Sequence, residues 1–189
     1  AFKKAGLQMV HLSNNLKRIE EEAFRDNEIK EIEFPKKLTF IGEGAFYNNK
    51  LSEVKIPEQI ESIAGRTFYK NELTHIDLPD SLKVIGSAAF SSNKLTNIQL
   101  PPNLEKIESR AFASNPITEL PKFPESLKSL SGFSNTEIKE LHIPATVETI
   151  ADSAFRNTPI EKLTVENGVK TIGKEAFKRT KLRELNIKI

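Results

Sequence analysis

Residues 73–90 read LTHIDLPDSLKVIGSAAF, and the chain repeats this pattern from one end to the other. The pattern closes on a phenylalanine that recurs nine times, at intervals of 22 residues except for one interval of 21. Alanine precedes it in seven copies, and Thr67 and Gly132 stand in the other two. A fixed period of this length is typical of repeat proteins. The nine copies are Phe2, Phe24, Phe46, Phe68, Phe90, Phe112, Phe133, Phe155 and Phe177.

Apolar residues keep the same phase within every unit. They stand five, eight and ten positions after the phenylalanine, as do Leu95, Ile98 and Leu100, and a proline usually follows. A second apolar pair, such as Leu104 and Ile107, precedes the next phenylalanine. A 22-residue unit cannot bury its apolar side alone, whereas stacked units bury a continuous core. The sequence therefore predicts a repeat solenoid.

Each unit predicts three local structures. The L-x-x-L-x-L segment ends in a two-residue alternation, which favours a short strand, and these strands would form a parallel sheet on the concave face. The proline ends the pairing because it has no N–H. The L-x-x-I segment predicts a second short strand or a turn on the convex side. The E-x-A-F segment, as at 43–46, predicts a helical or 3₁₀ turn, in which alanine lets the coils approach and phenylalanine fills the space between them.

A polar residue stands three positions after the phenylalanine. It is asparagine in the second to sixth units and threonine in the last three. Both side chains can bond backbone groups that a turn leaves unpaired. We therefore interpret these residues as structural corners of the coil. They are Asn27, Asn49, Asn71, Asn93, Asn115, Thr136, Thr158 and Thr180.

The unit L-x-x-L-x-L-P-x-x-L-x-x-I-x-x-x-A-F-x-x-N resembles the BspA-type leucine-rich repeat, also called the Treponema pallidum type, over essentially the whole chain. The corner residue is often cysteine in that family and is asparagine or threonine here. The resemblance implies a right-handed leucine-rich-repeat coil. It also implies an extracellular protein of the bacterial cell surface, whose repeats bind host matrix proteins, host cells or other bacteria.

Composition and motifs exclude several classes of protein. The 189 residues are 38% apolar and carry a net charge of +2, which favours one folded domain and gives no sign of nucleic-acid binding. No apolar run approaches the roughly 18 residues of a membrane span. The absence of cysteine excludes disulfides, thiolate catalysis and cysteine-bound zinc. The chain has no metalloprotease, serine-hydrolase, P-loop or dinucleotide-binding motif, so we expect no enzyme and no cofactor.

The candidate binding residues lie on the predicted sheet. Positions seven and nine after each phenylalanine alternate with core positions, so their side chains should point outward. Seven of these 18 residues are acidic and two are basic, whereas the whole chain is +2. An acidic sheet would attract a cationic partner surface, although charge on a solvated face also serves solubility. The predicted binding residues are Glu31, Glu33, Glu53, His75, Asp77, Asn97, Gln99, Glu119 and Glu140.

All three histidines also occupy outward positions of the predicted sheet. His11, His75 and His142 belong to the first, fourth and seventh units. Neighbouring strands lie roughly 4.8 Å apart, so these histidines cannot converge on one metal ion. We therefore expect no metal site, and a local cluster of His75 with Glu53 and Asp77 is the alternative that remains open.

The unit at 116–133 departs from the pattern. It contains Pro116, Pro121 and Pro124, has one extra residue before Phe123 and lacks two before Phe133. A bulge or kink in the solenoid is expected there. Bulges often lie at functional sites, and the alternative is an insertion that the fold merely tolerates.

The sequence leads to three hypotheses of function. We expect a single solenoid over 1–189 of about nine repeats, a monomer, cut without caps from a longer array because it opens in mid-repeat at Ala1. The first hypothesis is a non-enzymatic adhesin module that binds a host matrix or cell-surface protein, or another bacterium. The second is a spacer that presents another domain. The third is a glycan-binding or hydrolytic module that uses carboxylate pairs such as Glu31 with Glu33 or Glu53.

Overall fold

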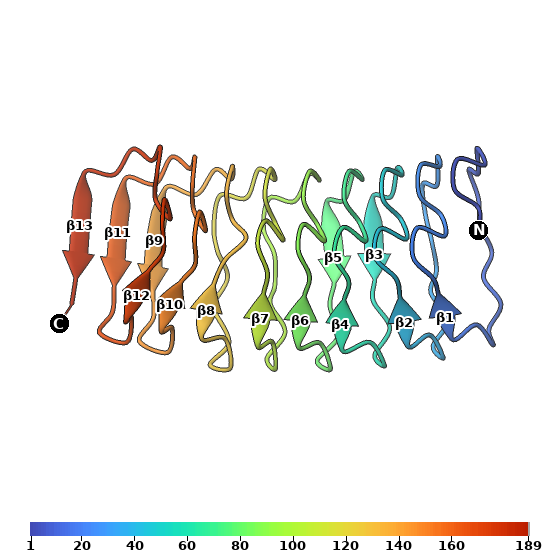
Figure 1. The fold of residues 1–189 in the computed structure, drawn as a ribbon, viewed down its shortest axis with the longest axis horizontal. Coiled ribbons are helices and arrows are strands. Elements are labelled where there is room, and N and C mark those ends of the chain that lie inside the picture. Colours follow the sequence, from blue (N-terminus) through green and yellow to red (C-terminus); the bar gives the residue numbers. More distant parts are fainter. Residues whose placement is uncertain (189) are drawn as a thin grey trace.

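The fold is a stack of coils, one for each 22-residue unit (Figure 1). The computed structural model describes residues 1–188. Over these residues the regular structure consists of short strands alone, and every strand pair is parallel. Paired residues lie one unit apart in the chain, as Glu53 opposite His75 does. The repeat solenoid predicted from the sequence is confirmed.

The L-x-x-L-x-L segments supply the first row of strands. Strands form in five of the nine units and pair as two separate sheets, β3-β5 and β9-β11-β13. The row contains β3 (Glu53–Lys55), β5 (His75–Asp77), β9 (Glu140–Ile143), β11 (Lys162–Val165) and β13 (Glu184–Ile187).

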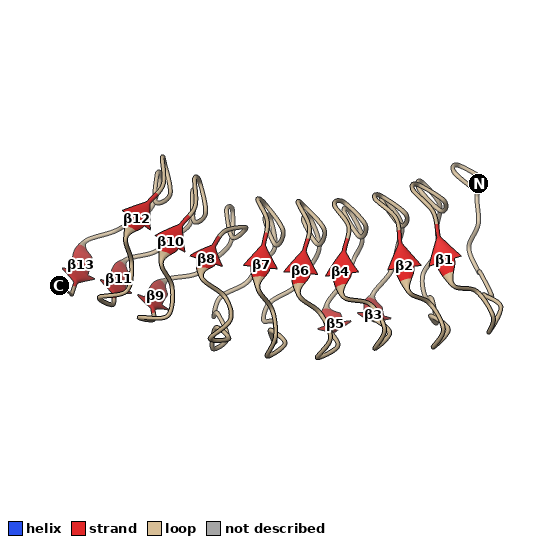
Figure 2. Ribbon diagram, turned by 60° about the horizontal axis from the view of Figure 1, so that its bottom comes forward, coloured by secondary structure: helices blue, strands red, loops and turns tan. Residues whose placement is uncertain are grey.

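The L-x-x-I segments supply the second row, as predicted. This row lies on a different side of the coil from the first (Figure 2). Its two-residue strands pair as β1-β2, β4-β6-β7 and β8-β10-β12. The strands are β1 (Arg18–Ile19), β2 (Phe40–Ile41), β4 (Ser62–Ile63), β6 (Val84–Ile85), β7 (Lys106–Ile107), β8 (Ser129–Leu130), β10 (Thr149–Ile150) and β12 (Thr171–Ile172).

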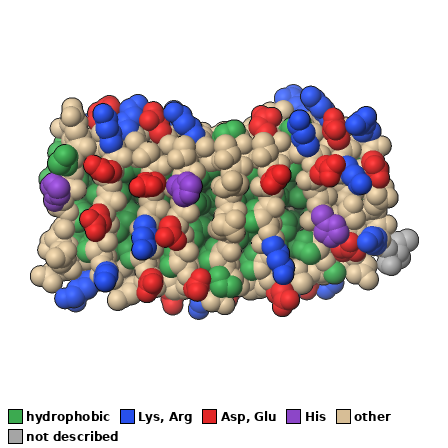
Figure 3. Space-filling model, turned by 180° about the vertical axis from the view of Figure 1, so that it is seen from behind, with side chains coloured by type: hydrophobic (Ala, Val, Ile, Leu, Met, Phe, Trp, Pro, Cys, Tyr) green, Lys and Arg blue, Asp and Glu red, His purple; other side chains and the backbone are tan. Residues whose placement is uncertain are grey.

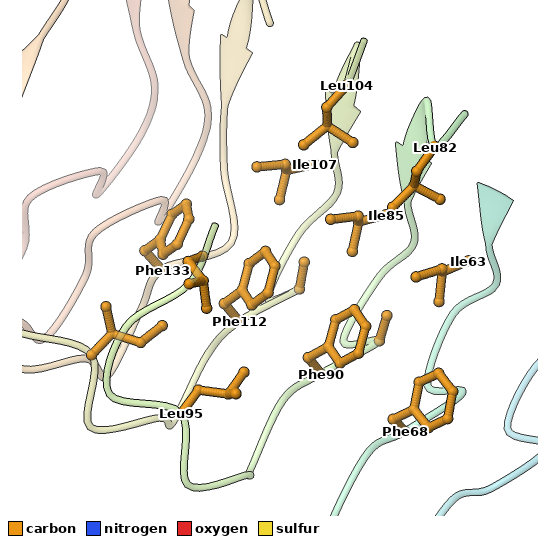
Figure 4. Close-up of a cluster of buried hydrophobic side chains, with 14 of the residues drawn as sticks. Ile63, Phe68, Leu82, Ile85, Phe90, Leu95, Leu104, Ile107, Phe112 and Phe133 are labelled. Atoms are coloured by element: carbon orange, nitrogen blue, oxygen red, sulfur yellow. The ribbon is translucent and has the colours of Figure 1, made fainter. Parts of the chain in front are cut away.

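The core is a continuous stack of phenylalanine rings between rows of aliphatic side chains (Figure 4). Successive rings lie 5.3 to 5.9 Å apart between centroids and are nearly parallel. The six rings from Phe46 to Phe155 are fully buried. Ala45, Ala89 and Ala111 are also fully buried. The predicted roles of the alanine and the phenylalanine are therefore confirmed.

The predicted helical turn in the E-x-A-F segment is wrong. Over 43–46 the chain forms successive tight turns, with Gly44 in the left-handed region at φ 63°. A residue with positive φ recurs in this segment of the later units, and it interrupts a right-handed helix. The N–H of Phe46 donates to the carbonyl of Thr67 in the next coil, at 2.9 Å. Alternate amides of this segment thus bond to the next coil, while the N–H groups of Ala45 and Tyr47 close β-turns with the carbonyls of Gly42 and Gly44.

The corner asparagines bond backbone groups of the turn, as predicted, and they also join adjacent coils. The buried Asn93 donates from Nδ2 to the carbonyl oxygens of Phe90 in its own coil and Phe68 in the preceding coil, both at 3.0 Å. Its Oδ1 accepts from the N–H of Leu73 at 3.0 Å. Thr136 and Thr158 are also buried, but each hydroxyl donates only to the phenylalanine carbonyl of its own coil.

Candidate binding face

The predicted outward residues form one continuous surface, which we call the LxxLxL face. It consists of the residues seven and nine positions after each phenylalanine, and it carries all three histidines (Figure 3). Sixteen of these 18 residues are exposed, while Pro121 and Thr164 are half-buried. The alternation between core and surface inferred from the sequence is confirmed in the first eight units, whereas in the ninth the predicted core residues Leu185 and Ile187 are exposed as well.

Strand pairing brings some of the predicted residues together. Glu53 lies opposite His75, and Lys55 lies opposite Asp77. Glu140 on β9 lies opposite Lys162 on β11. Within residues 1–188, no group of three or more histidine, aspartate and glutamate side chains is arranged to hold a metal ion.

The remaining predicted residues lie outside the strands. The outward segments of the first, second, fifth and sixth units form no ladder, although their side chains are exposed. These residues face solvent without a paired neighbour on the sheet. They are Glu31, Glu33, Asn97, Gln99 and Glu119.

The acidic side chains of the LxxLxL face are free of ion pairs. None of the seven takes part in a salt bridge within residues 1–188, whereas ten acidic side chains on other surfaces do. His142 contacts Glu166 at 3.2 Å, at the edge of this face. Uncompensated carboxylates make the face a source of negative potential. The seven are Glu31, Glu33, Glu53, Asp77, Glu119, Glu140 and Glu184.

A groove of about 1100 Å³ lies beside the irregular unit. The sequence indicated a bulge there but not a cavity, and its only signals were the extra residue and the prolines of 116–124. One side of the groove is formed by 118–125 and the other by residues of β9, β11 and their flanking segments. Its volume is slightly above the roughly 300–1,000 Å³ of typical ligand-binding pockets. The LxxLxL face is thus both charged and locally hollowed.

Sequence comparison identifies the repeat type. The family model described as the BspA type leucine rich repeat region matches in six copies, over residues 1–118 and 91–189. No curated protein sequence matches the chain significantly. No helix within residues 1–188 is long and apolar enough to cross a membrane.

Solved bacterial structures share this fold. A leucine-rich repeat protein from Bacteroides ovatus is 27% identical with a TM-score of 0.90, over 99% of this chain and 56% of that one. The pneumococcal vaccine antigen PcpA is 23% identical with a TM-score of 0.70, over 93% and 49%. A leucine rich cell surface protein from Faecalibacterium prausnitzii is 20% identical with a TM-score of 0.58, over 93% and 52%. The present chain therefore spans about half the length of these proteins.

Proposed function

This chain belongs to the BspA-type leucine-rich repeat family, and from that premise we propose that it is the protein-binding module of a bacterial cell-surface protein. Its partner is a host matrix or cell-surface protein, or a protein on another bacterium, and it binds through the LxxLxL face without catalysis. The observation that carries the proposal is the set of seven acidic side chains on this face, all free of ion pairs.

The chemistry of the face indicates the chemistry of the partner. Partner surfaces usually carry the opposite potential, because complementary charge steers the encounter and penalises wrong partners. A cationic patch therefore suits this face, and association should slow as salt is added. The similarity to a leucine rich cell surface protein and a vaccine antigen supports a surface location.

Charge reversal tests which surface binds. The face variant E31K/E33K/E53K/D77K changes four exposed residues of the LxxLxL face. The control variant E21K/E28K/E58K/D80K changes the net charge equally through four exposed residues of other surfaces. All eight side chains are free of ion pairs, so both variants should fold.

Binding is measured on immobilised matrix proteins, serum proteins and whole cells, at low and physiological salt. We expect saturable binding that the face variant loses and the control variant keeps. Equal binding by both variants would move the site to another surface. Absence of binding by the unmodified protein would favour the spacer, and binding only to saccharides would favour a glycan-binding module.

A further inference from the structure

The groove arises where the sixth unit has one residue too many. A regular unit has one residue between its last two core positions, whereas Pro121 and Lys122 both stand between Leu120 and Phe123. Phe123 is nevertheless buried, with 7% of its surface exposed. The core thus receives its usual side chain, and the two residues before it bulge from the coil. Pro121 in addition has no N–H to offer a neighbouring strand.

The bulge leaves one edge of β9 unpaired. Alternate residues of a parallel strand bond to opposite neighbours. The carbonyls of Lys139 and Ile143 accept hydrogen bonds from the eighth unit. Glu140 and His142 are out of phase with them, so their backbone groups face the sixth unit. Within residues 1–188, no backbone hydrogen bond joins 119–122 to β9. Such an edge is a template for another strand.

The groove has an apolar floor and charged rims. Leu120, Phe123, Leu141 and Pro144 supply apolar surface. The rims carry charged side chains of both signs, and none of them forms an ion pair within residues 1–188. They are Glu119, Lys122, Glu125, Glu137, Lys139, Glu140 and Lys162.

We infer that this groove binds an extended peptide segment of the partner protein, which adds as a strand to the open edge of β9. The inference rests on the proposed function, and it specifies the conformation and the side chains of the partner segment that binds. Backbone hydrogen bonds to Glu140 and His142 would hold the segment, as in other cases of strand addition. Alternate side chains of the segment point inward, where Leu120 and Leu141 favour apolar residues.

Outward side chains of the segment meet carboxylates on both sides. Glu119 and Glu140 both stand seven positions after their phenylalanines, so a strand between them places one outward residue beside each. Opposite charges on neighbouring strands attract. The segment that fits therefore alternates apolar residues with at least one basic residue.

Synthetic peptides test the chemistry. The probe is a fluorescent, end-capped heptapeptide of alternating valine and lysine, measured by anisotropy on the full chain. One control peptide replaces lysine by glutamate. A second keeps every side chain but carries N-methyl groups on alternate backbone nitrogens. We expect binding of the first peptide only, with slower amide hydrogen exchange at Glu140 and His142. Equal binding of the N-methylated peptide would overturn strand addition.

Two protein variants test whether the lysine peptide binds in the groove. In the groove variant E119K/E140K, two flanking attractions become repulsions, and we expect the dissociation constant of the lysine peptide to rise roughly tenfold. The control pair E21K/E28K, which changes the net charge equally through two exposed residues of other surfaces, should change it by less than twofold. Equal weakening by both variants would show that the peptide responds to the overall charge of the protein and not to the groove. That result would overturn the inference that the groove is the binding site.

The same reagents separate this inference from the proposed function. Suppose that surface proteins bind the unmodified protein and the groove variant but not the face variant. The groove inference would then be wrong, while the proposed function would stand. If the peptide binds in the groove but no surface protein binds anywhere, the proposed function fails alone. A dimer in sedimentation that the groove variant abolishes would identify a second copy as the occupant, which also overturns the inference.

Discussion

The side chain of Asn93 holds two coils together with its amide group. It donates to two phenylalanine carbonyls and accepts from the N–H of Leu73, and all four residues are buried. A backbone group that loses such a partner inside the protein costs about 1–3 kcal/mol. The asparagine row therefore stabilises each turn of the solenoid against separation from its neighbour.

Replacement of this asparagine should be costly. We expect Asn93→Ala to lower the free energy of unfolding by about 1–3 kcal/mol, because the buried N–H of Leu73 loses its partner. The carbonyls of Phe90 and Phe68 keep the hydrogen bonds that they accept from Asn115 and Asn71. Asn93→Thr should recover little of the loss, since the corner hydroxyl of Thr136 donates to the carbonyl of its own phenylalanine and accepts no backbone N–H within residues 1–188. Urea denaturation measures the change. The neighbouring exposed Lys94→Ala serves as the control and should shift stability by less than about 0.5 kcal/mol. Equal losses for the two alanine variants would contradict the structural role.

Glu175 gives a pH-dependent prediction. Its hydrogen bond from Lys178, at 3.0 Å, lowers the pKa of this carboxyl below the ordinary value of 4.5, with nearby positive charges acting in the same direction. A lowered pKa stabilises the fold above the unfolded value, and that stabilisation disappears as pH falls through the folded pKa. An NMR titration should find the pKa of Glu175 below 4.5, and Lys178→Ala should raise it. An unchanged value in that variant would exclude Lys178 as the main cause.

At the scale of elements, charges alternate along the second row of strands. From Glu61 to Lys170, the residue immediately before each strand is alternately a glutamate and a lysine. In the adjacent pair Glu148 and Lys170, the Lys170 Nζ lies 3.1 Å from Oε2 of Glu148. Within residues 1–188, backbone hydrogen bonds also join all neighbouring members except Glu105 and Lys128. Opposite charges on adjacent strands stabilise their pairing, so this row favours the correct order of coils. The alternating members are Glu61, Lys83, Glu105, Lys128, Glu148 and Lys170.

Reversal of one charge should destabilise this row. Lys83→Glu places three carboxylates in succession, and we expect a loss of up to about 1 kcal/mol at low salt. Addition of 1 M salt should remove most of the loss, because the side chains are exposed and screening is strong. The triple variant E61K/K83E/E105K restores alternation at these sites and should recover part of the stability. A loss that salt does not alter would point to packing instead of charge.

At the scale of the whole molecule, the first row of strands is divided. β5 and β9 belong to separate sheets, with the fifth and sixth units between them forming no ladder on this side. The core continues through the division, since the rings of Phe90, Phe112 and Phe133 remain stacked. At this division the coils are held together by the core, by corner side chains such as Asn115 and by backbone hydrogen bonds of the turns, such as the one from the N–H of Phe112 to the carbonyl of Gly132.

Hydrogen exchange should reveal this division. Amides of 97–99, Glu119, Leu120 and Lys122 should exchange faster than those of β11, which has a paired neighbour on each side. Mass spectrometry of peptides after deuterium labelling gives the comparison. The terminal units need to be set aside, because chain ends open readily in any solenoid. Similar protection in the two regions would indicate that the sheet is continuous in solution.

The repeat, its core and most of the side chains that face outward could be predicted from the sequence. These features depend on local alternation and on one 22-residue period, so they can be read without knowledge of distant contacts. The helical turn predicted for the E-x-A-F segment is wrong because the prediction used only this local sequence. Its apolar residues fit a helical turn, but residues such as Gly44 adopt positive φ and the amides bond to the next coil.

Only the tertiary structure decided how the coils meet. The sequence predicted a strand in every unit, yet first-row strands form in five of the nine units within residues 1–188. Pairing depends on whether neighbouring backbones keep register, and in the sixth unit the extra residue at Pro121 and Lys122 breaks it. The number of charges on the LxxLxL face can be counted from the sequence, whereas the absence of ion pairs to its carboxylates within residues 1–188 is known only from the structure. Freedom from ion pairs and the groove beside β9 both depend on distances between coils, which no single unit encodes.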